Sequence, residues 1–230
     1  MQKNIIITGA SRGIGRELAK IHLQNGNNVL VISRNEEKLK ELFEFEINSK
    51  LIILPMDISK PGDLDMLSGA VRNWEKVDVL YNNAGFLVNK PFGQITEKEL
   101  QYSLEVNYKA PFRMIQLLLD KMDATSHIVN ITTMGAVQGS VKFPGLAAYS
   151  STKTGIVTLT ELLAQEFTDE QPRINAVALG AVQTEMLAEA FPDYLAPVSA
   201  EAMAEYLYDF GLGGHRFQNG KVIQLSTTTP

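Results

Sequence analysis

A tyrosine and a lysine four residues apart are the first side chains in this sequence that could do chemistry. Tyr149 and Lys153 lie in a stretch with a helical pattern, where this spacing places both side chains on one face. A free tyrosine titrates near about pH 10, and a neighbouring ammonium group lowers that pKa by favouring the phenolate. The pair therefore suits proton transfer to or from a carbonyl or alcohol oxygen. The alternative is an amphipathic surface pair, which is common on helices.

A glycine-rich segment near the amino terminus could hold a phosphate. The residues from Thr8 to Gly15 read TGASRGIG, between an apolar β-branched run and a helical pattern. Glycine at positions 9, 13 and 15 permits a tight turn, close approach of the backbone to a ligand and close packing of helix on strand. The helix start offers unpaired N–H groups and a positive dipole end, which suit a pyrophosphate. Glycine needed for packing alone is the alternative, but the position in the first strand–helix unit favours a nucleotide site.

These residues must be positioned by an alternation of strands and helices that runs along the whole chain. The apolar runs that predict strands are Asn4–Thr8, Asn28–Ser33, Leu51–Met56, Val77–Tyr81, His127–Ile131, Arg173–Leu179 and Lys221–Leu225. Helices are predicted at Ile14–Gln24, after Asn35, and at Pro61–Trp74, Thr96–Met122, Ala147–Phe167 and Ala200–Phe210. Near-continuous apolar strands are typical of a sheet covered on both faces. We therefore predict an α/β fold, a single Rossmann-type doubly wound domain over 1–230 with about seven parallel strands and helices on both faces.

Composition narrows the classes of function. The 230 residues are 45% hydrophobic and 20% charged, with a formal net charge of −5. An acidic balance argues against broad binding to nucleic acid or anionic membranes. No cysteine is present, which excludes thiolate chemistry and fits a reducing cytoplasm. The three histidines are far apart without ligand spacing, so no metal site is expected, and no apolar run is long enough to predict a membrane span.

Taken together, the motifs resemble the short-chain dehydrogenase/reductase family. TGASRGIG resembles its cofactor loop, Asn82-Asn83-Ala84-Gly85 its NNAG motif, and Asp57 its adenine-contacting acid. The resemblance implies a catalytic tetrad of Asn107, Thr133, Tyr149 and Lys153. It implies cofactor contacts from the residues of these motifs and from the ends of the strands: Gly9, Ser11, Arg12, Gly13, Ile14, Gly15, Ser33, Arg34, Asp57, Ile58, Asn83, Ala84, Gly85, Tyr149, Lys153, Gly180, Val182 and Thr184.

Three positions bear on how the catalytic residues work. Pro111 lacks an N–H, so it would free the carbonyl of Asn107 and kink the helix, and in the family that carbonyl binds a water. Thr133 stands where the family has serine; it keeps the hydroxyl, adds a methyl group and narrows the pocket. Thr132 is the weaker alternative, because strand alternation turns it the other way. Leu179 replaces the family's usual proline before Gly180, so the following loop is expected to be less rigid.

The end of the second predicted strand indicates which dinucleotide binds. NAD sites usually place an acid there to hold the ribose 2′-OH, but this strand ends in Ser33-Arg34. Arg34 and Arg12 could both pair with a 2′-phosphate through charge-assisted contacts. The sequence therefore favours NADP(H) as the cofactor. The alternatives are that both arginines are exposed surface charges, and that Glu36 holds a ribose hydroxyl.

The segment after Thr184 is expected to cover the substrate. It forms a lid around residues 184–199, and Thr184 could also cap a helix at Glu185–Ala190. Candidate substrate contacts are mostly apolar, which favours a neutral aldehyde or ketone over an anion: Phe86, Leu87, Val137, Phe143, Met186, Leu187, Phe191 and Tyr194.

The sequence thus predicts an NADP(H)-dependent oxidoreductase that interconverts a small neutral carbonyl and its alcohol. A non-catalytic NADP(H)-sensing or partner-binding module on the same fold is one alternative, and an epimerase or dehydratase is another. The resemblance also implies a homodimer or homotetramer that pairs the helices Thr96–Met122 and Ala147–Phe167. The stripe Leu159, Leu162, Leu163 and Phe167 fits that pairing, but it also fits core packing.

Overall fold

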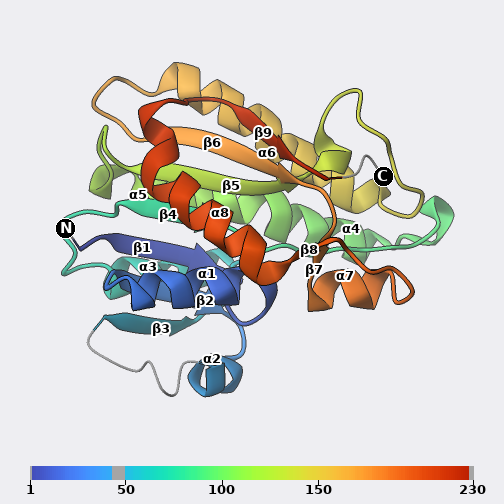
Figure 1. Cartoon of the computed structure of the whole chain (residues 1–230), viewed down its shortest axis with the longest axis horizontal. Helices are drawn as coiled ribbons and strands as arrows, with labels where there is room; N and C mark the ends of the chain where they lie inside the picture. Colours follow the sequence, from blue (N-terminus) through green and yellow to red (C-terminus); the bar gives the residue numbers. More distant parts are fainter. Residues whose placement is uncertain (1, 43–49, 228–230) are drawn as a thin grey trace.

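A seven-stranded parallel sheet forms the middle of the molecule, in a computed structural model that describes residues 2–42 and 50–227 (Figure 1). The strand order is β3-β2-β1-β4-β5-β6-β9. Strands are added to one side of β1 up to β3 and to its other side from β4 on, so the order reverses between β1 and β4. The strands are β1 (Asn4–Thr8), β2 (Asn28–Ser33), β3 (Leu51–Pro55), β4 (Val79–Asn82), β5 (His127–Thr133), β6 (Arg173–Leu179) and β9 (Val222–Leu225). The predicted doubly wound α/β fold is confirmed.

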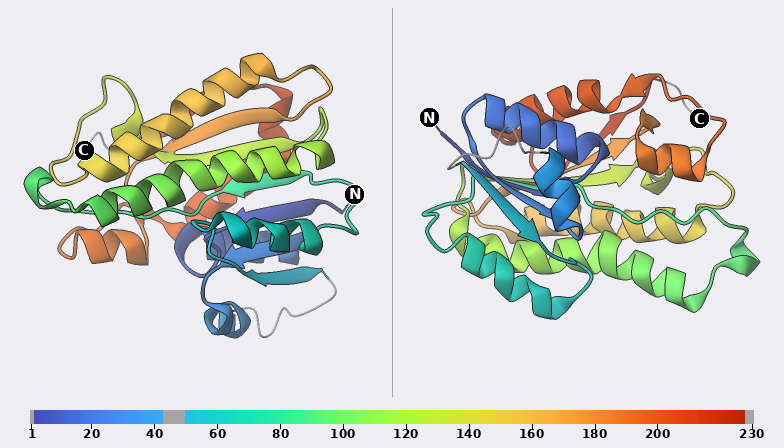
Figure 2. Two further views of the ribbon diagram at one scale, coloured as in Figure 1. Left: turned by 180° about the vertical axis from the view of Figure 1, so that it is seen from behind. Right: turned by 90° about the horizontal axis from the view of Figure 1, so that it is seen from below.

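Helices cover both faces of this sheet, as Figure 2 shows from behind and from below. On one face lie α1 (Gly13–Gln24), α2 (Glu36–Leu42) and α8 (Ala200–Gly213), whose apolar residues share a core with one side of the strands. On the other lie α3 (Leu64–Ala70), α4 (Glu97–Leu104), α5 (Ala110–Leu118) and α6 (Ala147–Glu166). Because both strand faces are buried, β1 and β2 carry isoleucine, valine and leucine at successive positions.

The long helix predicted over Thr96–Met122 is divided in the structure. Thr96 caps α4 with a capping box to Glu99. A π-helical turn at Glu105–Lys109 then separates α4 from α5, and Ala110 N–H bonds the carbonyl of Glu105. The wide turn comes just before Pro111, whose ring crowds the carbonyl four residues earlier. In place of the predicted kink, the helix therefore has a π-helical turn before the proline. The helix predicted at Pro61–Trp74 is also shorter, a 3₁₀ turn at Pro61–Asp63 followed by α3.

A second, two-stranded parallel sheet was not predicted. It pairs β7 (Val182–Gln183) with β8 (Val198–Ser199). The short helix α7 (Glu185–Ala190) begins directly after β7, at the bounds that the sequence predicts. The ends of the segment between β7 and β8 are thus joined by backbone pairing.

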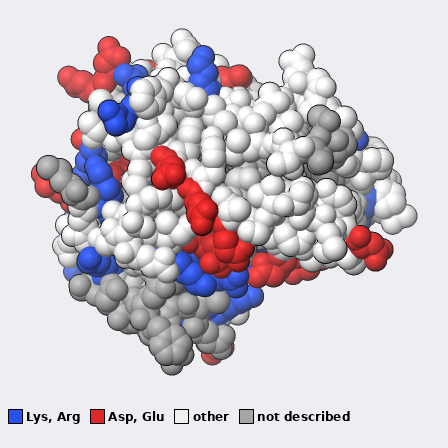
Figure 3. Space-filling model, in the orientation of Figure 1, with Lys and Arg blue, Asp and Glu red and all other residues white. Residues whose placement is uncertain are grey.

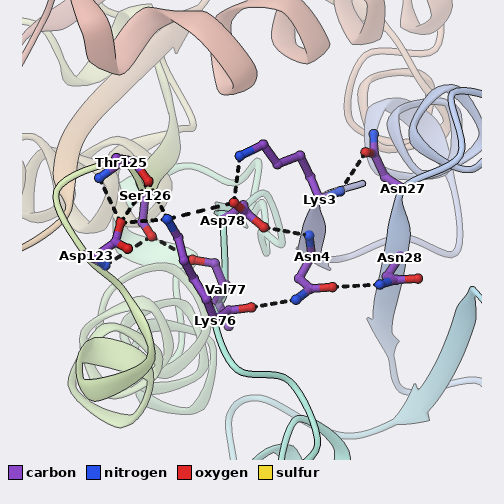
Figure 4. Close-up of polar contacts among 10 residues, drawn as sticks. All are labelled: Lys3, Asn4, Asn27, Asn28, Lys76, Val77, Asp78, Asp123, Thr125 and Ser126. Carbon is purple, nitrogen blue, oxygen red and sulfur yellow. Dashed lines mark hydrogen bonds and ion pairs between the residues drawn. The ribbon is translucent and has the colours of Figure 1, made fainter. Parts of the chain in front are cut away.

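Polar side chains join the amino ends of four strands at the edge opposite the carboxyl ends (Figure 4). Asp78 accepts hydrogen bonds from Lys3 Nζ (2.9 Å) and from the backbone N–H of Asn4 (2.8 Å). Asn4 in turn bonds Lys76 O and accepts from Asn28. Further along, Lys76 forms an ion pair with Asp123. These contacts fix the register of β1, β2 and β4 at the edge away from the chemistry considered next.

Two of the three histidines are buried in the fold, and the centre of the His127 ring lies 5.6 Å from that of the His215 ring. His22 contacts Tyr81 and Asn27, and His127 contacts Gly211 O and Asn175. Burial lowers the pKa of His22 to about 3 and that of His127 to about 4. Within residues 2–42 and 50–227, no cluster of three or more potential ligands could hold a metal ion. No helix in the same ranges has the length and apolar character to cross a membrane.

Candidate active site

A cavity lies at the carboxyl ends of the parallel strands, near the point between β1 and β4 where the strand order reverses. Its volume is about 530 Å³, and its walls come from the segments after β1, β2, β3, β4, β5 and β6 together with α7. Figure 1 shows these strand ends facing α7. Open α/β sheets bind ligands at this position, and the volume is within the usual range of ligand pockets, about 300–1,000 Å³.

Glycine is required at three positions of the loop that follows β1. Gly9 and Gly13 have φ angles of 70° and 54°, which favour glycine. A Cβ atom on Gly9 would lie 2.8 Å from the Cα of Ala84. A Cβ on Gly15 would lie 2.5 Å from both the Gly9 carbonyl oxygen and the Asn83 amide. The loop and the start of α1 are therefore packed against each other with no space for a side chain at Gly15.

The segment after β4 is hydrogen-bonded directly to this loop. The hydroxyl of Thr8 accepts from the backbone N–H groups of Asn83 and Ala84, both at 3.0 Å. The amide of Asn83 donates to Thr8 O (2.9 Å) and Gly9 O (3.4 Å). Asn83 thus positions the glycine-rich loop, and it also lines the cavity. Neighbouring Asn82 is buried and donates instead to Asn130.

Tyr149 and Lys153 both line the cavity, on the first turns of α6. The Tyr149 hydroxyl has no hydrogen-bond partner within the described part of the chain, and burial raises its pKa to about 12. Lys153 Nζ donates to Ile131 O (2.8 Å) and Ala84 O (3.4 Å), and burial lowers its pKa to about 8. The expectation that Lys153 lowers the pKa of Tyr149 is therefore wrong for this structure. The ammonium group is held by two backbone carbonyls, and desolvation dominates at the phenol.

The other two residues of the predicted tetrad occupy different positions. Thr133 lines the cavity, and its hydroxyl accepts from Gly135 N–H (3.3 Å). Thr132 is turned away to donate to Lys153 O (3.1 Å), as strand alternation predicts. Asn107 is fully buried behind the cavity wall: its side chain accepts from Phe86 N–H (2.8 Å) and donates to Phe86 O (2.9 Å). Asn107 therefore supports the segment after β4 through its amide.

Both predicted phosphate-binding arginines line the cavity, but each has a protein partner. Arg34 donates to the Tyr102 hydroxyl at 2.6 Å, and its guanidinium carbon lies 6.0 Å from the centre of that ring. Arg12 pairs with Glu189 on α7. Neither Tyr102 nor Glu189 was predicted, because each comes from a distant part of the sequence without a motif.

The predicted lid segment lies over the cavity and is held at several points. Thr184 caps α7 by accepting from Leu187 N–H at 3.2 Å, as its alternative role predicts. The amide of Asn89 donates to Ala190 O at 2.8 Å. Nearer β8, Gln183 accepts from Ala196 N–H at 2.8 Å. These contacts tie α7 to the segment after β4 and close its far end onto β7.

Most predicted site residues are brought together in the cavity. Of the predicted cofactor contacts, Gly15 is missing from the wall because it lies beneath the loop. Of the predicted substrate contacts, Val137 is missing, and the others line the cavity: Phe86, Leu87, Phe143, Met186, Leu187, Phe191 and Tyr194. Met134 and Leu146 line it as well and were not predicted, since single apolar residues carry no signal of their own.

The residues present fit a dinucleotide. The glycine-rich loop lines the cavity, and it leads into a helix whose dipole favours phosphate. Arg12, Arg34 and Asp57 lie in the wall of the same cavity. Asp57 is also held in place, since one carboxylate oxygen accepts from both Ser59 N–H (3.0 Å) and Ser59 Oγ (2.7 Å).

Comparison with known proteins agrees with this architecture. The family model described as short chain dehydrogenase matches residues 3–195. The rat protein "Dehydrogenase/reductase SDR family member 6" is 33% identical over 189 residues, which cover 81% of this chain and 74% of the relative.

Two solved structures resemble the fold closely. A short chain dehydrogenase from Burkholderia cenocepacia in complex with NADP has a TM-score of 0.88 at 21% identity, covering 99% of this chain and 97% of that one. A 3-ketoacyl-(acyl-carrier-protein) reductase from Brucella melitensis complexed with NADH has a TM-score of 0.86 at 23% identity, covering 97% and 96%. At these identities both structures bear on the fold alone.

Proposed function

The chain belongs to the short-chain dehydrogenase family of oxidoreductases, and we propose that it is an NADP(H)-dependent enzyme that interconverts a small neutral carbonyl and its alcohol. One observation carries this proposal: the Tyr149 phenol, which has no hydrogen-bond partner among the described residues, lines the same cavity as a glycine-rich loop of the kind that binds phosphate. Tyr149 supplies the acid, and the loop that starts at Gly9 holds the dinucleotide. The whole of 1–230 acts as one cofactor-binding unit, with residues 184–199 as its lid.

The side chains of this protein supply the proton and orient the substrate. Because the pKa of Tyr149 is raised to about 12, its phenol is protonated at neutral pH and can donate to a carbonyl oxygen. Lys153 stays largely protonated below its pKa of about 8, so its ammonium group can donate to the ribose hydroxyls of the nicotinamide half, as the family resemblance implies. Thr133 positions the substrate oxygen with its hydroxyl. A bound nicotinamide cofactor supplies the hydride.

The cofactor is held by residues from several strand ends. We assign the pyrophosphate to the loop Gly9–Gly15, adenine to Asp57 and Ile58, and the nicotinamide half to the segment after β6. The remaining contacts are Ser33, Asn83, Ala84, Gly85, Gly180, Val182 and Thr184, all of which line the cavity. Asn107 acts indirectly, by holding Phe86 and the segment that contains Gly85.

The substrate side of the cavity supports a neutral carbonyl. Its wall is aromatic and aliphatic, with Phe86, Phe143, Phe191 and Tyr194 among the lining residues. Among the lining residues, the positive charges are those of Arg12 and Arg34 and of Lys153 beside Tyr149. All three are assigned to the cofactor or to the proton transfer, so these lining residues leave no further cation for an anionic substrate. An aldehyde or ketone with an apolar substituent fits it best.

Replacing Arg34 by alanine tests the cofactor preference. Loss of a charge-assisted contact to an exposed 2′-phosphate should weaken NADPH binding about tenfold, since such contacts contribute about 1.5–3 kcal/mol before solvent screening. NADH lacks that phosphate, so its affinity should change little. Isothermal titration of both cofactors measures the effect, with Arg72→Ala, an exposed arginine just past α3, as the control. Equal wild-type affinities for the two cofactors would contradict the NADP(H) preference.

We also propose that copies of the chain associate as a homodimer or homotetramer through α5 and α6. Leu162 on α6 is 60% exposed and Phe112 on α5 is 36% exposed, which supports a partner on that face. Leu159, by contrast, is buried in the core, with Leu163 and Phe167 packed against it. Sedimentation velocity that finds a single 25.4 kDa species at micromolar concentration would contradict this association.

A further inference from the structure

The lid helix presents a carboxylate to one of the arginines assigned to the cofactor. Glu189 on α7 and Arg12 in the loop after β1 are 177 residues apart in sequence. Both guanidinium Nη atoms meet the carboxylate: Nη1 pairs with Oε1, and Nη2 donates to Oε2 at 3.2 Å. This two-pronged arrangement is the one that a guanidinium also forms with phosphate oxygens.

The surroundings of Glu189 are those of an anion site. The pKa of its carboxyl is held below the usual range, mainly by the hydrogen bond from Arg12, with the charges of Arg12 and Lys38 acting in the same direction. Lys38 is on α2, which begins just after the Ser33-Arg34 end of β2. The carboxylate thus lies among cations that come from two other parts of the chain. Elsewhere on the surface, Figure 3 shows a stripe of acidic side chains that ends beside a group of basic ones.

We infer that Glu189 is a selectivity-determining residue: its carboxylate competes with the 2′-phosphate of NADP(H) for Arg12. The inference rests on the proposed function, because it assumes that Arg12 meets this phosphate. One guanidinium edge cannot serve both anions, so a 2′-phosphate must displace Glu189. A dinucleotide without this phosphate leaves the pair intact. Glu189 therefore reduces the preference for NADP(H) that Arg12 and Arg34 would otherwise give.

The test compares two ligands that differ only in the 2′-phosphate, 2′,5′-ADP and 5′-AMP. The quantity measured is the ratio of their dissociation constants in the wild type and in Glu189→Gln, by isothermal titration at low salt. Glutamine keeps the size of the side chain but removes its charge. Because an exposed ion pair contributes up to about 1 kcal/mol, the ratio should rise about two- to fivefold in favour of 2′,5′-ADP. The gain should shrink at high salt, which screens exposed charges.

Glu185→Gln is the matched control on the same helix. Its carboxylate lies 3.8 Å from Arg16 and close to Gly13, so it bears on the 5′-phosphate that both ligands carry. This change should leave the ratio unaltered. A ratio that is the same in Glu189→Gln and in the wild type overturns the inference.

The ratio of the two dissociation constants in the wild type distinguishes a failure of the competition from a failure of the proposed cofactor preference. If wild type favours 2′,5′-ADP and Glu189→Gln changes nothing, the competition is wrong and the cofactor preference stands. If neither protein favours 2′,5′-ADP, both the competition and the preference are wrong. A ratio that rises only in Glu189→Gln supports the competition.

Discussion

Tyr149→Phe should lower kcat about a thousandfold, because a positioned general acid contributes about 10²–10⁴ to the rate. The change removes a hydroxyl that has no hydrogen-bond partner in the described residues, so folding should be unaffected. NADPH binding should stay within a few-fold of the wild type. The measurement is NADPH oxidation with a panel of aldehydes and ketones, accompanied by titration of the cofactor.

The control for this variant is Tyr206→Phe, which removes the hydroxyl of a partly exposed tyrosine on α8 outside the cavity. It should retain the wild-type rate. Turnover near that of the wild type in Tyr149→Phe would end the proposed role of this residue. A wild-type protein that binds NADPH but reduces no carbonyl would favour a sensing module, and product formed without net redox change would favour an epimerase or dehydratase.

Gly15→Ala should destabilise the protein and weaken dinucleotide binding together. The new Cβ atom would lie 2.5 Å from the Gly9 carbonyl oxygen and 2.5 Å from the Asn83 amide, and neither is the end of a long flexible side chain. Overpacking of this kind costs about 1–3 kcal/mol. Any shift that relieves the clash moves the glycine-rich loop itself, so NADPH affinity should fall at least about tenfold, equivalent to about 1.4 kcal/mol. Urea unfolding and isothermal titration measure the two effects.

Gly69→Ala provides a control of opposite sign. Gly69 is also helical, in α3, but a Cβ atom there would meet nothing within 4 Å. Alanine should therefore raise the free energy of unfolding by about 0.5–1 kcal/mol, through the lower entropy of the unfolded chain and better helix propensity. Equal effects of the two substitutions would show that packing at Gly15 is not the cause.

The features that depend on short segments of sequence were predictable. The strands β1, β2 and β6 and the helix α7 have the predicted bounds, because apolar runs and capping residues act locally. The position of the cavity was predictable too. In a parallel sheet, residues that follow different strands meet at one edge, so Gly9, Asn83 and Thr133 line a common space.

The features that depend on contacts between distant segments were not predictable. Tyr149 and Lys153 share a helix as expected, yet desolvation by the surrounding fold sets the direction of both pKa shifts. The partners of the two arginines, Tyr102 and Glu189, come from α4 and α7 and carry no motif. The short strand β8 consists of two residues, too few to give an alternating or apolar pattern.

The pairing of β7 with β8 holds together the two ends of the segment that contains α7, so this segment can change in length while the main sheet stays the same. Val182 pairs with Val198 and Gln183 with Ser199, so the two ends stay together whatever lies between them. Lengthening an already closed loop is inexpensive, since doubling it costs only about 0.6 kcal/mol. Insertions between Ala190 and β8 can therefore be accommodated without displacing the sheet, as long as α7 keeps the Glu189 contact with Arg12.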